Sequence, residues 1–452
     1  MDATSAALLD YCASMDSSAL AQSTVHECKR RVIDTVASAL FGYDEPISSA
    51  ARRVAQRYRS SEHGASVWGC SWTTSPEAAA FANGTMVRFL DLSDMYAGRG
   101  AGHPSDVIAG IVALAQSIGA SGSDTIGAIT IAYDVYCSFC DAIDISAKGW
   151  DQPVPVVIAS AVAMAKLARL SREQSAHALA LAVAPNMALY QTRRGELSSW
   201  KGAAGANGAR NALFAVALAS EGFTGPSAVF DGKNGLREIV GDFEWKMPSM
   251  DGTPRAIERT HMKTFPICYH GQSAAWAALA LRPRIDLKEI AGIEVLTHAA
   301  AIDRMANDPA RWAPRSHETA DHSLPYVVSM ALLDGSLSAK SFAQERLDDP
   351  RMAELMKKVS VRESAAYCAN YPRLSECRLT IRKTDGTSEA FEVDLPKGHI
   401  GNPLTDAELE GKYRDAFTSY GDASQCGKSL AAFWKLEEAD KLSLVFDTLV
   451  KG

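Results

Sequence analysis

Small residues dominate the apolar faces of a series of helix-periodic segments that fills more than the first half of the chain. In residues 25–43, apolar side chains recur every three or four positions. Residues 203–223 repeat the pattern with mostly alanine and glycine, and Gly222 ends it. Ser171 and Gln174 have the spacing of a capping box for a further helix. Because small side chains let helices approach closely, this part predicts a compact all-helical bundle.

The pattern changes after the segment KTFPICYHGQ, at about residue 264. Short runs rich in β-branched residues follow at 292–298, 357–363 and 377–395. The last run contains Asp385-Gly386, the strongest hairpin signal in the chain, and helix-periodic segments such as LPYVVSMALLDG lie between the runs. This alternation predicts an α+β unit inserted after the helical part.

The expected fold is therefore mainly α with an α+β insert. We expect a helical domain over residues 1–263, a smaller α+β lid domain over 264–398, and C-terminal helices over 399–452 that return to the helical domain. Only two crossings, at 263–266 and 396–403, join the parts. Two short hinges permit rigid-body closure of a lid.

Composition excludes several classes of function. A formal net charge of −7 is unusual for a nucleic-acid binder. No stretch reaches the ~18 apolar residues of a membrane span, and the N-terminus lacks the pattern of a secretory signal. Nine scattered cysteines are typical of a reducing compartment. These features predict a cytoplasmic protein.

The stretch DLSDMYAGRGAGHPSD, residues 91–106, concentrates groups that can carry chemistry. Asp91 and Asp94 fall near the end of an expected helix, and a glycine run lets His103 fold back toward them. A neighbouring carboxylate would raise the pKa of His103 and orient its ring for proton transfer. A metal site on the same three residues and a histidine that merely pins the loop are the alternatives.

Two local features near this stretch have structural interpretations. The glycines of GRGAGH alternate without a preceding strand, which does not fit a dinucleotide-binding loop. Ser105 or Asp106 is expected to cap the helix that follows. Cys137 and Cys140 form a CxxC pair without a second ligand pair nearby, so two residues on one helix face are the favoured interpretation.

Five blocks in order resemble the MmgE/PrpD family, whose members include 2-methylcitrate dehydratases, cis-aconitate decarboxylases and iminodisuccinate epimerases. They are DLSDMYAGRGAGHPSD, GWDQPVPVVIASAVAMAK, ELSSWKGAAGANGARNALFAVALASEGFTGP, KTFPICYHGQSAAWAALAL and ETADHSLPYVVSMALLDG. The resemblance runs nearly end to end. It implies the helical domain with an inserted lid described above, a homodimer, no organic cofactor and no metal.

The resemblance also implies a site between the two domains. His103 and Asp91 would form the acid–base pair with Asp94 close by, and Lys201 and Lys263 would hold substrate carboxylates. On the lid side it implies substrate contacts from His270, Gln272 and Tyr326, and Arg194 with its neighbour Arg193 is a candidate carboxylate clamp. His322 is expected to cap a helix.

The best single expectation is 2-methylcitrate dehydration by a cofactor-independent lyase. Related acids such as cis-aconitate or iminodisuccinate, with decarboxylation or epimerisation in place of dehydration, are the alternatives. Met95 replaces a threonine of many members, and Asp151 and Gln152 stand where decarboxylases have a histidine, so both departures weaken a decarboxylase assignment. Outside enzymes, the alternative is an inactive helical scaffold.

Overall fold

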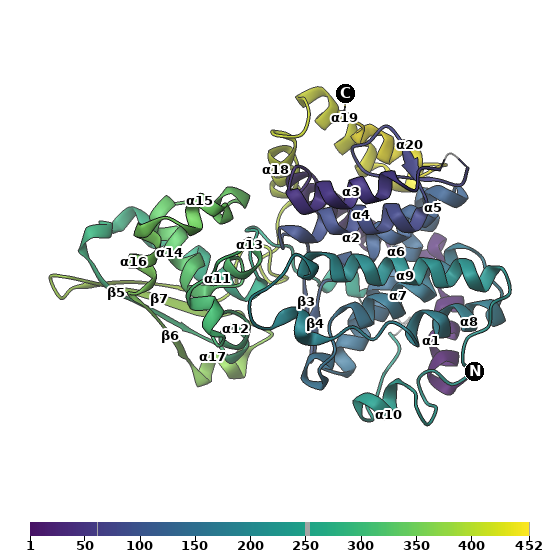
Figure 1. The fold of residues 1–452 in the computed structure, drawn as a ribbon, viewed down its shortest axis with the longest axis horizontal. Helices are drawn as coiled ribbons and strands as arrows, with labels where there is room; N and C mark the ends of the chain where they lie inside the picture. Colours follow the sequence, from purple (N-terminus) through teal and green to yellow (C-terminus); the bar gives the residue numbers. More distant parts are fainter. Residues whose placement is uncertain (61, 249–253, 452) are drawn as a thin grey trace.

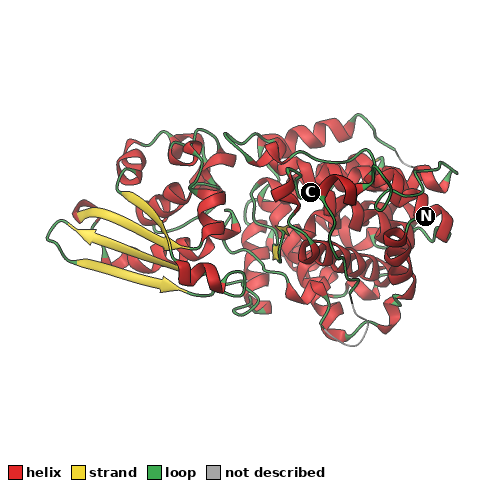
Figure 2. Ribbon diagram, turned by 90° about the horizontal axis from the view of Figure 1, so that it is seen from below, coloured by secondary structure: helices red, strands yellow, loops and turns green. Residues whose placement is uncertain are grey.

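A computed structural model describes residues 1–60, 62–248 and 254–451. These residues are mainly helical, with one four-stranded sheet and two short strand pairs (Figures 1 and 2). Among the described residues, no helix combines the length and the apolar character needed to cross a membrane.

The described residues before 221 form nine longer helices, and this helical part lies on the right of Figure 1. They are α1 (Ala3–Ser14), α2 (Gln22–Phe41), α3 (Pro46–Gln56), α4 (Pro76–Phe89), α5 (Ile108–Ile118), α6 (Gly122–Ala142), α7 (Pro153–Leu167), α8 (Arg172–Val183) and α9 (Trp200–Ser220), followed by the short α10 (Leu236–Val240). The predicted helices at 25–43 and 203–223 are confirmed as α2 and α9. The capping box of Ser171 and Gln174 is also confirmed, at the start of α8.

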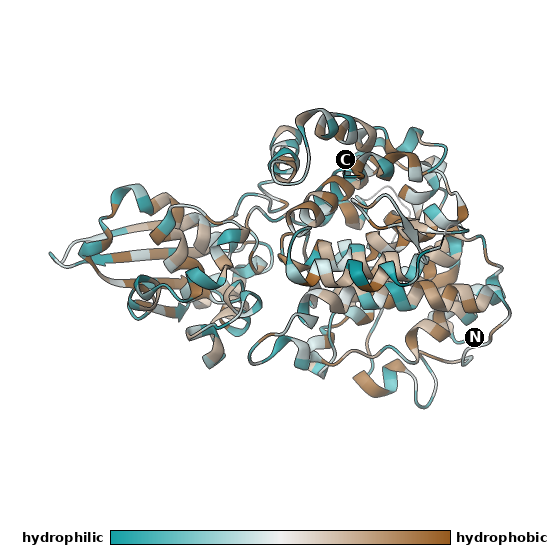
Figure 3. Ribbon diagram, turned by 45° about the horizontal axis from the view of Figure 1, so that its top comes forward, coloured by the Kyte–Doolittle hydropathy of each residue, from teal (hydrophilic) through white to brown (hydrophobic). Residues whose placement is uncertain are grey.

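Small residues bring these helices into close contact, as their abundance predicts. A Cβ placed on Gly84 of α4 would lie 2.7 Å from the Cβ of Ala206 on α9. Gly202 of α9 packs against the backbone of Phe89, where a Cβ would lie 3.1 Å from its Cα. Figure 3 shows apolar positions, in brown, along the central helices of this part. The α4–α9 contact fixes the position of two chain segments that supply the site.

The chain end returns to this helical core. Helices α18 (Asp406–Phe417), α19 (Ala423–Trp434) and α20 (Ser443–Phe446) follow the insert, and Thr405 caps α18 in a capping box with Glu408. Side chains of these helices share one apolar cluster with residues of α1 to α9. The domain boundaries predicted from the sequence stay a prediction.

A four-stranded mixed sheet lies in the other part, on the left of Figure 1, with strand order β6-β5-β7-β8. Strand β5 (Ile290–Thr297) pairs parallel with β6 (Val359–Glu363) and antiparallel with β7 (Cys377–Lys383), and β7 forms a hairpin with β8 (Ser388–Val393). Asp385 and Gly386 make the predicted turn, and Gly386 has φ +86°.

Helices cover the sheet and form a second apolar cluster with it. The longer ones are α11 (Gln272–Leu281) and α14 (Leu324–Asp334), and the short ones are α12 (Ala299–Met305), α13 (His317–Ala320), α15 (Gln344–Leu347), α16 (Pro350–Met356) and α17 (Ala365–Asn370). The expected helix at LPYVVSMALLDG is confirmed as α14.

The two crossings between the parts lie side by side. The imidazoles of His261 and His399 stack with their centroids 4.4 Å apart, and the backbone N–H of Met262 donates to the carbonyl of Gly398 over 2.9 Å. Gly398 has φ +90°, and a Cβ there would lie 1.9 Å from the carbonyl oxygen of Met262. The two crossings are therefore in direct contact, and we call the contact of residues 261–262 with residues 398–399 the joint between the two parts.

Two small antiparallel pairs interrupt the helical part, where the sequence predicted helices almost throughout. They are β1 (Ala65–Ser66) with β2 (Thr73–Thr74), and β3 (Tyr96–Ala97) with β4 (Ala101–Gly102). The β3–β4 hairpin lies within residues 91–106, the stretch that contains Asp91, Asp94 and His103.

The predicted helix caps at Ser105 and Asp106 are wrong. Residues Pro104–Val107 form a 3-10 turn, and α5 begins after it with no side-chain cap. Asp106 instead lies 3.2 Å from the Nε of Arg88, and the backbone N–H of Ser105 donates to Asp94. The Asp106 carboxylate is thus paired with a buried guanidinium, and the Ser105 hydroxyl is buried without a partner among the described residues.

Candidate active site between the two cores

Asp91 lies just after the end of α4 in an unusual backbone conformation. Its φ is +51°, in the left-handed region that non-glycine residues seldom adopt. Its backbone N–H donates to the carbonyl of Arg88, which closes the last turn. Such strain persists only where surrounding contacts determine the conformation, and it is concentrated at functional sites.

Three cations surround the buried Asp91 carboxylate. The Lys263 ammonium lies 2.6 Å from Oδ1 and also donates to the Asp91 carbonyl at 2.8 Å. The Arg88 guanidinium donates to Oδ1 at 2.7 Å, and the Lys201 ammonium lies 3.4 Å from Oδ2. Burial alone would raise the pKa of Asp91, but Lys263, Lys201 and Arg88 together hold it well below its usual range. Asp91 is therefore a carboxylate and a poor proton donor.

The β3–β4 hairpin brings His103 back toward Asp91. A Cβ on Gly102 would lie 2.0 Å from the Tyr136 hydroxyl, so only glycine fits this return. His103 Nδ1 lies 2.7 Å from the carbonyl oxygen of Asp94, and its Nε2 lies 3.8 Å from Asp91 Oδ1. Because a carbonyl oxygen only accepts, Nδ1 carries the proton and Nε2 presents its lone pair.

The expected rise in the pKa of His103 is wrong. Burial lowers this pKa well below its usual value, and the positive charges of Arg88 and Lys263 lower it further, which outweighs the effect of Asp91. The ring is therefore neutral. A neutral imidazole with a free Nε2 is a proton acceptor.

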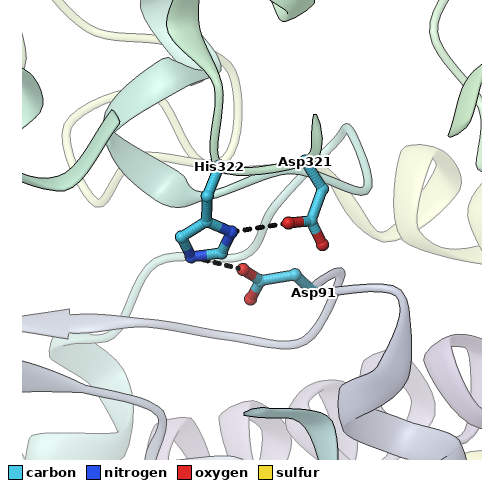
Figure 4. Close-up of side chains that lie close together, drawn as sticks. All are labelled: Asp91, Asp321 and His322. Atoms are coloured by element: carbon cyan, nitrogen blue, oxygen red, sulfur yellow. Dashed lines mark hydrogen bonds and ion pairs between the residues drawn. The ribbon is translucent and has the colours of Figure 1, made fainter. Parts of the chain in front are cut away.

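His322 and Asp321 also belong to the charged cluster that Asp91 forms with its three cations. The sequence predicted only that His322 caps a helix. Figure 4 shows the His322 ring between two carboxylates: Nδ1 lies 2.6 Å from Asp321 Oδ1, and Nε2 lies 3.4 Å from Asp91 Oδ2. Ser323, not His322, caps α14. Asp321 also accepts from the Lys201 ammonium at 2.7 Å. The cap prediction for His322 is wrong because the adjacent serine takes that role.

The same three residues resemble a metal-ligand set. One ligand atom from each of Asp91, Asp321 and His322 lies within 4.8 Å of the others. However, the ammonium groups of Lys201 and Lys263 already contact the two carboxylates. A divalent cation at this point would face two nearby positive charges, so the residues fit a cation-balanced acid cluster better than a metal centre.

A cavity of about 880 Å³, its open mouth included, lies beside this cluster and between the two cores. From the helical side it is lined by Arg88, Asp91, Met95, His103, Gln152, Arg193 and Lys263, among others. From the sheet-containing side it is lined by Cys268, Tyr269, His270, Arg304 and His322. The cavity thus receives side chains from both parts of the chain.

Comparison with known proteins identifies the architecture. The sequence pattern of the MmgE/PrpD N-terminal domain matches residues 6–247, and that of the MmgE/PrpD C-terminal domain matches residues 265–438. The chain belongs to the MmgE/PrpD family. The resemblance noted from the sequence blocks is confirmed.

Several characterised relatives span most of this chain. Cis-aconitate decarboxylase of Mus musculus is 26% identical over 456 residues, which cover 96% of this chain and 90% of its own length. 2-Methylcitrate dehydratase of Escherichia coli K12 is 28% identical over 427 residues, with 87% and 85% covered. Alkylcitrate dehydratase phiI of a fungal species is 28% identical over 382 residues, with 76% and 74% covered.

Of the residues that the MmgE/PrpD resemblance implied, Asp91, His103, Lys201 and Lys263 lie together in the cluster. His270 lines the cavity, and its Nε2 lies 3.1 Å from the Tyr371 hydroxyl. Their catalytic or binding roles stay predictions.

The remaining implied residues have other partners in this MmgE/PrpD chain. Asp94 accepts from the Ser105 N–H and from the Tyr133 hydroxyl, and Gln272 bonds to the backbone of Thr264 and Phe265. The Tyr326 hydroxyl donates to the Ser341 carbonyl inside the second core. Arg194 pairs with Asp303 at the surface, where its side chain is 44% exposed.

Arg193, the neighbour of Arg194, faces the cavity instead. Its Nε donates to Asp151 over 2.9 Å and its Nη1 to the Lys201 carbonyl over 3.0 Å. Its Nη2 is buried and has no partner among the described residues, and the same holds for Gln152 Nε2 and Tyr269 Oη. These three groups leave hydrogen-bonding capacity at the cavity wall. The Asp151 and Gln152 departures from the decarboxylase pattern therefore lie at the cavity itself.

Proposed function

We propose that this protein is a cofactor-independent lyase that acts on a small di- or tricarboxylate, with 2-methylcitrate dehydration as the leading reaction. The observation that carries the proposal is the neutral His103, whose free Nε2 faces a cavity lined by cations and next to the Asp91 cluster. A carbon next to a carboxylate is weakly acidic, so a base alone does not suffice. It needs positive charge where the enediolate-like anion develops.

The cationic wall supplies that charge. Arg88, Lys263, Arg193 and Arg304 line the cavity, and Lys201 lies directly behind Asp91. Lys201 and Lys263 are balanced by Asp91 and Asp321, so their role in this proposal is to fix the cluster next to bound substrate. A donor aimed at developing negative charge contributes about 3–4 kcal/mol to transition-state stabilisation.

In this proposal, substrate carboxylates bind to polar groups that have no hydrogen-bond partner among the described residues. Arg193, Gln152 and Tyr269 come from both parts of the chain and line the same cavity, and each has a buried polar atom without a partner among the described residues: Nη2, Nε2 and Oη. An unmet buried donor costs about 1–3 kcal/mol, which a bound carboxylate oxygen restores. Of the two candidate clamps, Arg193 and Arg194, the proposal assigns the role to Arg193, which lines the cavity.

An inactive scaffold fits these features poorly. Keeping Asp91, Asp321, Lys201 and Lys263 charged and buried is costly, and replacing such clusters by apolar residues is often stabilising. The named activities of the relatives, dehydration and decarboxylation of tricarboxylates, support a lyase. The homodimer that the resemblance implies belongs to this proposal as well.

A substrate panel tests the proposal. Purified protein is incubated with 2-methylcitrate, citrate, cis-aconitate and iminodisuccinate, and the reaction is followed by ultraviolet absorbance of a conjugated product, by CO₂ release and by NMR. We expect loss of water from 2-methylcitrate without CO₂ release. CO₂ release from cis-aconitate identifies a decarboxylase, inversion without elimination identifies an epimerase, and no change in any acid by folded protein contradicts the proposal.

A further inference from the structure

Cys268 belongs to the second apolar core and lines the cavity together with Asp91, Lys263 and His322. It directly precedes the 3-10 turn Tyr269–Gly271, and its side chain lines the cavity although the residue is only 7% exposed. Its backbone N–H donates to the Asp321 carbonyl over 3.0 Å, which ties it to the turn that carries His322. Sequence reasoning assigned no role to this thiol.

The thiol has two imidazoles beside it. Its Sγ lies 3.5 Å from His270 Nδ1, and His322 lines the same cavity. His322 Nδ1 in turn lies 2.6 Å from Asp321 Oδ1. Cys268 and His270 therefore form a thiol–imidazole contact beside the His322–Asp321 pair, and such a contact allows a thiol to exchange its proton.

A second feature shows that a ligand belongs beside this thiol. Tyr269, the next residue, lines the cavity and is 3% exposed, and its buried hydroxyl has no partner among the described residues. Gln152 Nε2 and Arg193 Nη2 are likewise unmet in the helical part of the same wall. Cys268 therefore shares a cavity with three residues that each have an unpartnered polar atom, to which a ligand rich in oxygen can hydrogen-bond.

The other buried thiols differ from Cys268 in their electrostatics. Burial raises the pKa of Cys140, which lines the same cavity, and Asp141 and Asp144 raise it further. Burial by itself would also raise the pKa of Cys268, but His322 and the Lys263 ammonium lower it. The pKa values of the two thiols in this cavity are thus shifted in opposite directions, up for Cys140 and down for Cys268.

We propose that Cys268 is the group that protonates the departing hydroxyl, and this inference rests on the lyase function proposed above. His103 Nε2 takes the proton from carbon, the electron pair of the C–H bond forms the C=C bond, and the C–O bond breaks. The departing oxygen receives the thiol proton and leaves as water. The thiolate beside His322 and the His103 imidazolium then return to their starting states by proton exchange with solvent.

The first test measures the thiol in the resting wild-type protein. Alkylation by iodoacetamide is followed for each cysteine by mass spectrometry as a function of pH, with and without tricarballylate. We expect Cys268 to react at lower pH than Cys140 and to be protected by tricarballylate. Alkylation of Cys268 only at the pH at which Cys140 reacts, or without protection, overturns the proposal.

The second test uses turnover. We expect Cys268→Ser to lower kcat by about 100-fold with little change in KM, and to remove the alkaline limb of the kcat–pH profile. Cys368→Ser, on α17 away from the cavity, is the matched control and is expected to keep wild-type rates. Cys268→Ala serves if the serine variant does not fold. Wild-type-like turnover by a folded Cys268 variant overturns this inference alone, whereas an inactive wild type overturns the lyase function and this step with it.

Discussion

At the scale of single residues, the surroundings impose protonation states that the residue types alone do not reveal. Asp91 is a carboxylate because three cations contact it, and His103 is neutral because it is buried beside two of those cations. The pair therefore consists of a fixed anion and a neutral base. Proton transfer in this site starts at His103 Nε2.

Lys201 offers a direct test of the charge balance. Lys201→Met leaves Asp321 and Asp91 short of one positive charge inside the protein. Breaking a buried ion pair on one side costs about 3–5 kcal/mol, so we expect the free energy of unfolding to fall by that amount in urea titrations. Lys233→Met, at an exposed position, is the control. Equal stabilities of the two variants would mean that Lys201 is not balancing this cluster.

The sequence predicted Asp91, His103, Lys201 and Lys263 because each lies in a recognisable block. It did not reveal Asp321, His322 and Cys268 as members of the site. Asp321 and His322 lie more than 200 residues from Asp91, and His322 was assigned to a helix cap, a role that Ser323 takes. The pKa of His103 was predicted in the wrong direction because its burial and its proximity to Arg88 and Lys263 arise only in three dimensions.

At the scale of elements, the spacing between α4 and α9 sets the site. Asp91 follows α4, Lys201 lies in the first turn of α9, and Gly84 holds the two helices in contact. We expect Gly84→Ala to lower stability by about 1–3 kcal/mol and also to reduce activity, because the added methyl group has no room.

The control for this change is Gly427→Ala in the middle of α19. No heavy atom lies within 4 Å of the added Cβ, so we expect it to be neutral or to stabilise by up to about 1 kcal/mol. Thermal melting and turnover are measured on both variants. Full activity of Gly84→Ala would show that the site tolerates movement of these helices.

The joint between the two parts predicts a dependence of stability on pH. Burial lowers the pKa of His261 from 6.5 to about 3 and that of His399 to about 4, and both Nδ1 atoms accept backbone N–H groups. These neutral rings stabilise the fold fully above pH 6.5, and the contribution is lost as the pH falls from 6.5 toward 4.

We expect His399→Asn to flatten the fall in melting temperature over that pH window, because the amide oxygen still accepts the Gly401 N–H but does not titrate. His63→Asn, an exposed position, should leave the curve unchanged. Parallel curves for wild type and His399→Asn would exclude His399 as a contributor to acid sensitivity.

Turns and caps were predicted correctly where all the interacting groups lie within a few residues of one another in the sequence. The Asp385-Gly386 turn and the Ser171 capping box each involve groups close in sequence, and both are present. The caps assigned to Ser105 and Asp106 failed because Arg88 on another element pairs with Asp106. Local patterns therefore predict elements well until a buried charge from elsewhere competes for the same groups.

At the scale of the whole molecule, two apolar cores meet at one cavity whose wall comes from both. If the sheet-containing part closes over a ligand, hydrogen exchange should slow in both parts together when tricarballylate is added. We expect protection at 91–106, at 263–272 and at 316–323. Protection confined to the helical part would contradict a site that spans the two cores.

The central claim is that His103 removes a carbon-bound proton so that a tricarboxylate loses water. Proton NMR of 2-methylcitrate with wild type and with His103→Asn tests it most directly. The asparagine amide replaces the Nδ1–H bond to Asp94 but lacks the Nε2 base. The account predicts that wild type converts the acid to an unsaturated tricarboxylate and that the variant, with an unchanged melting temperature, does so about 100-fold or more slowly. Equal rates for the two proteins, or no conversion by the wild type, would contradict it.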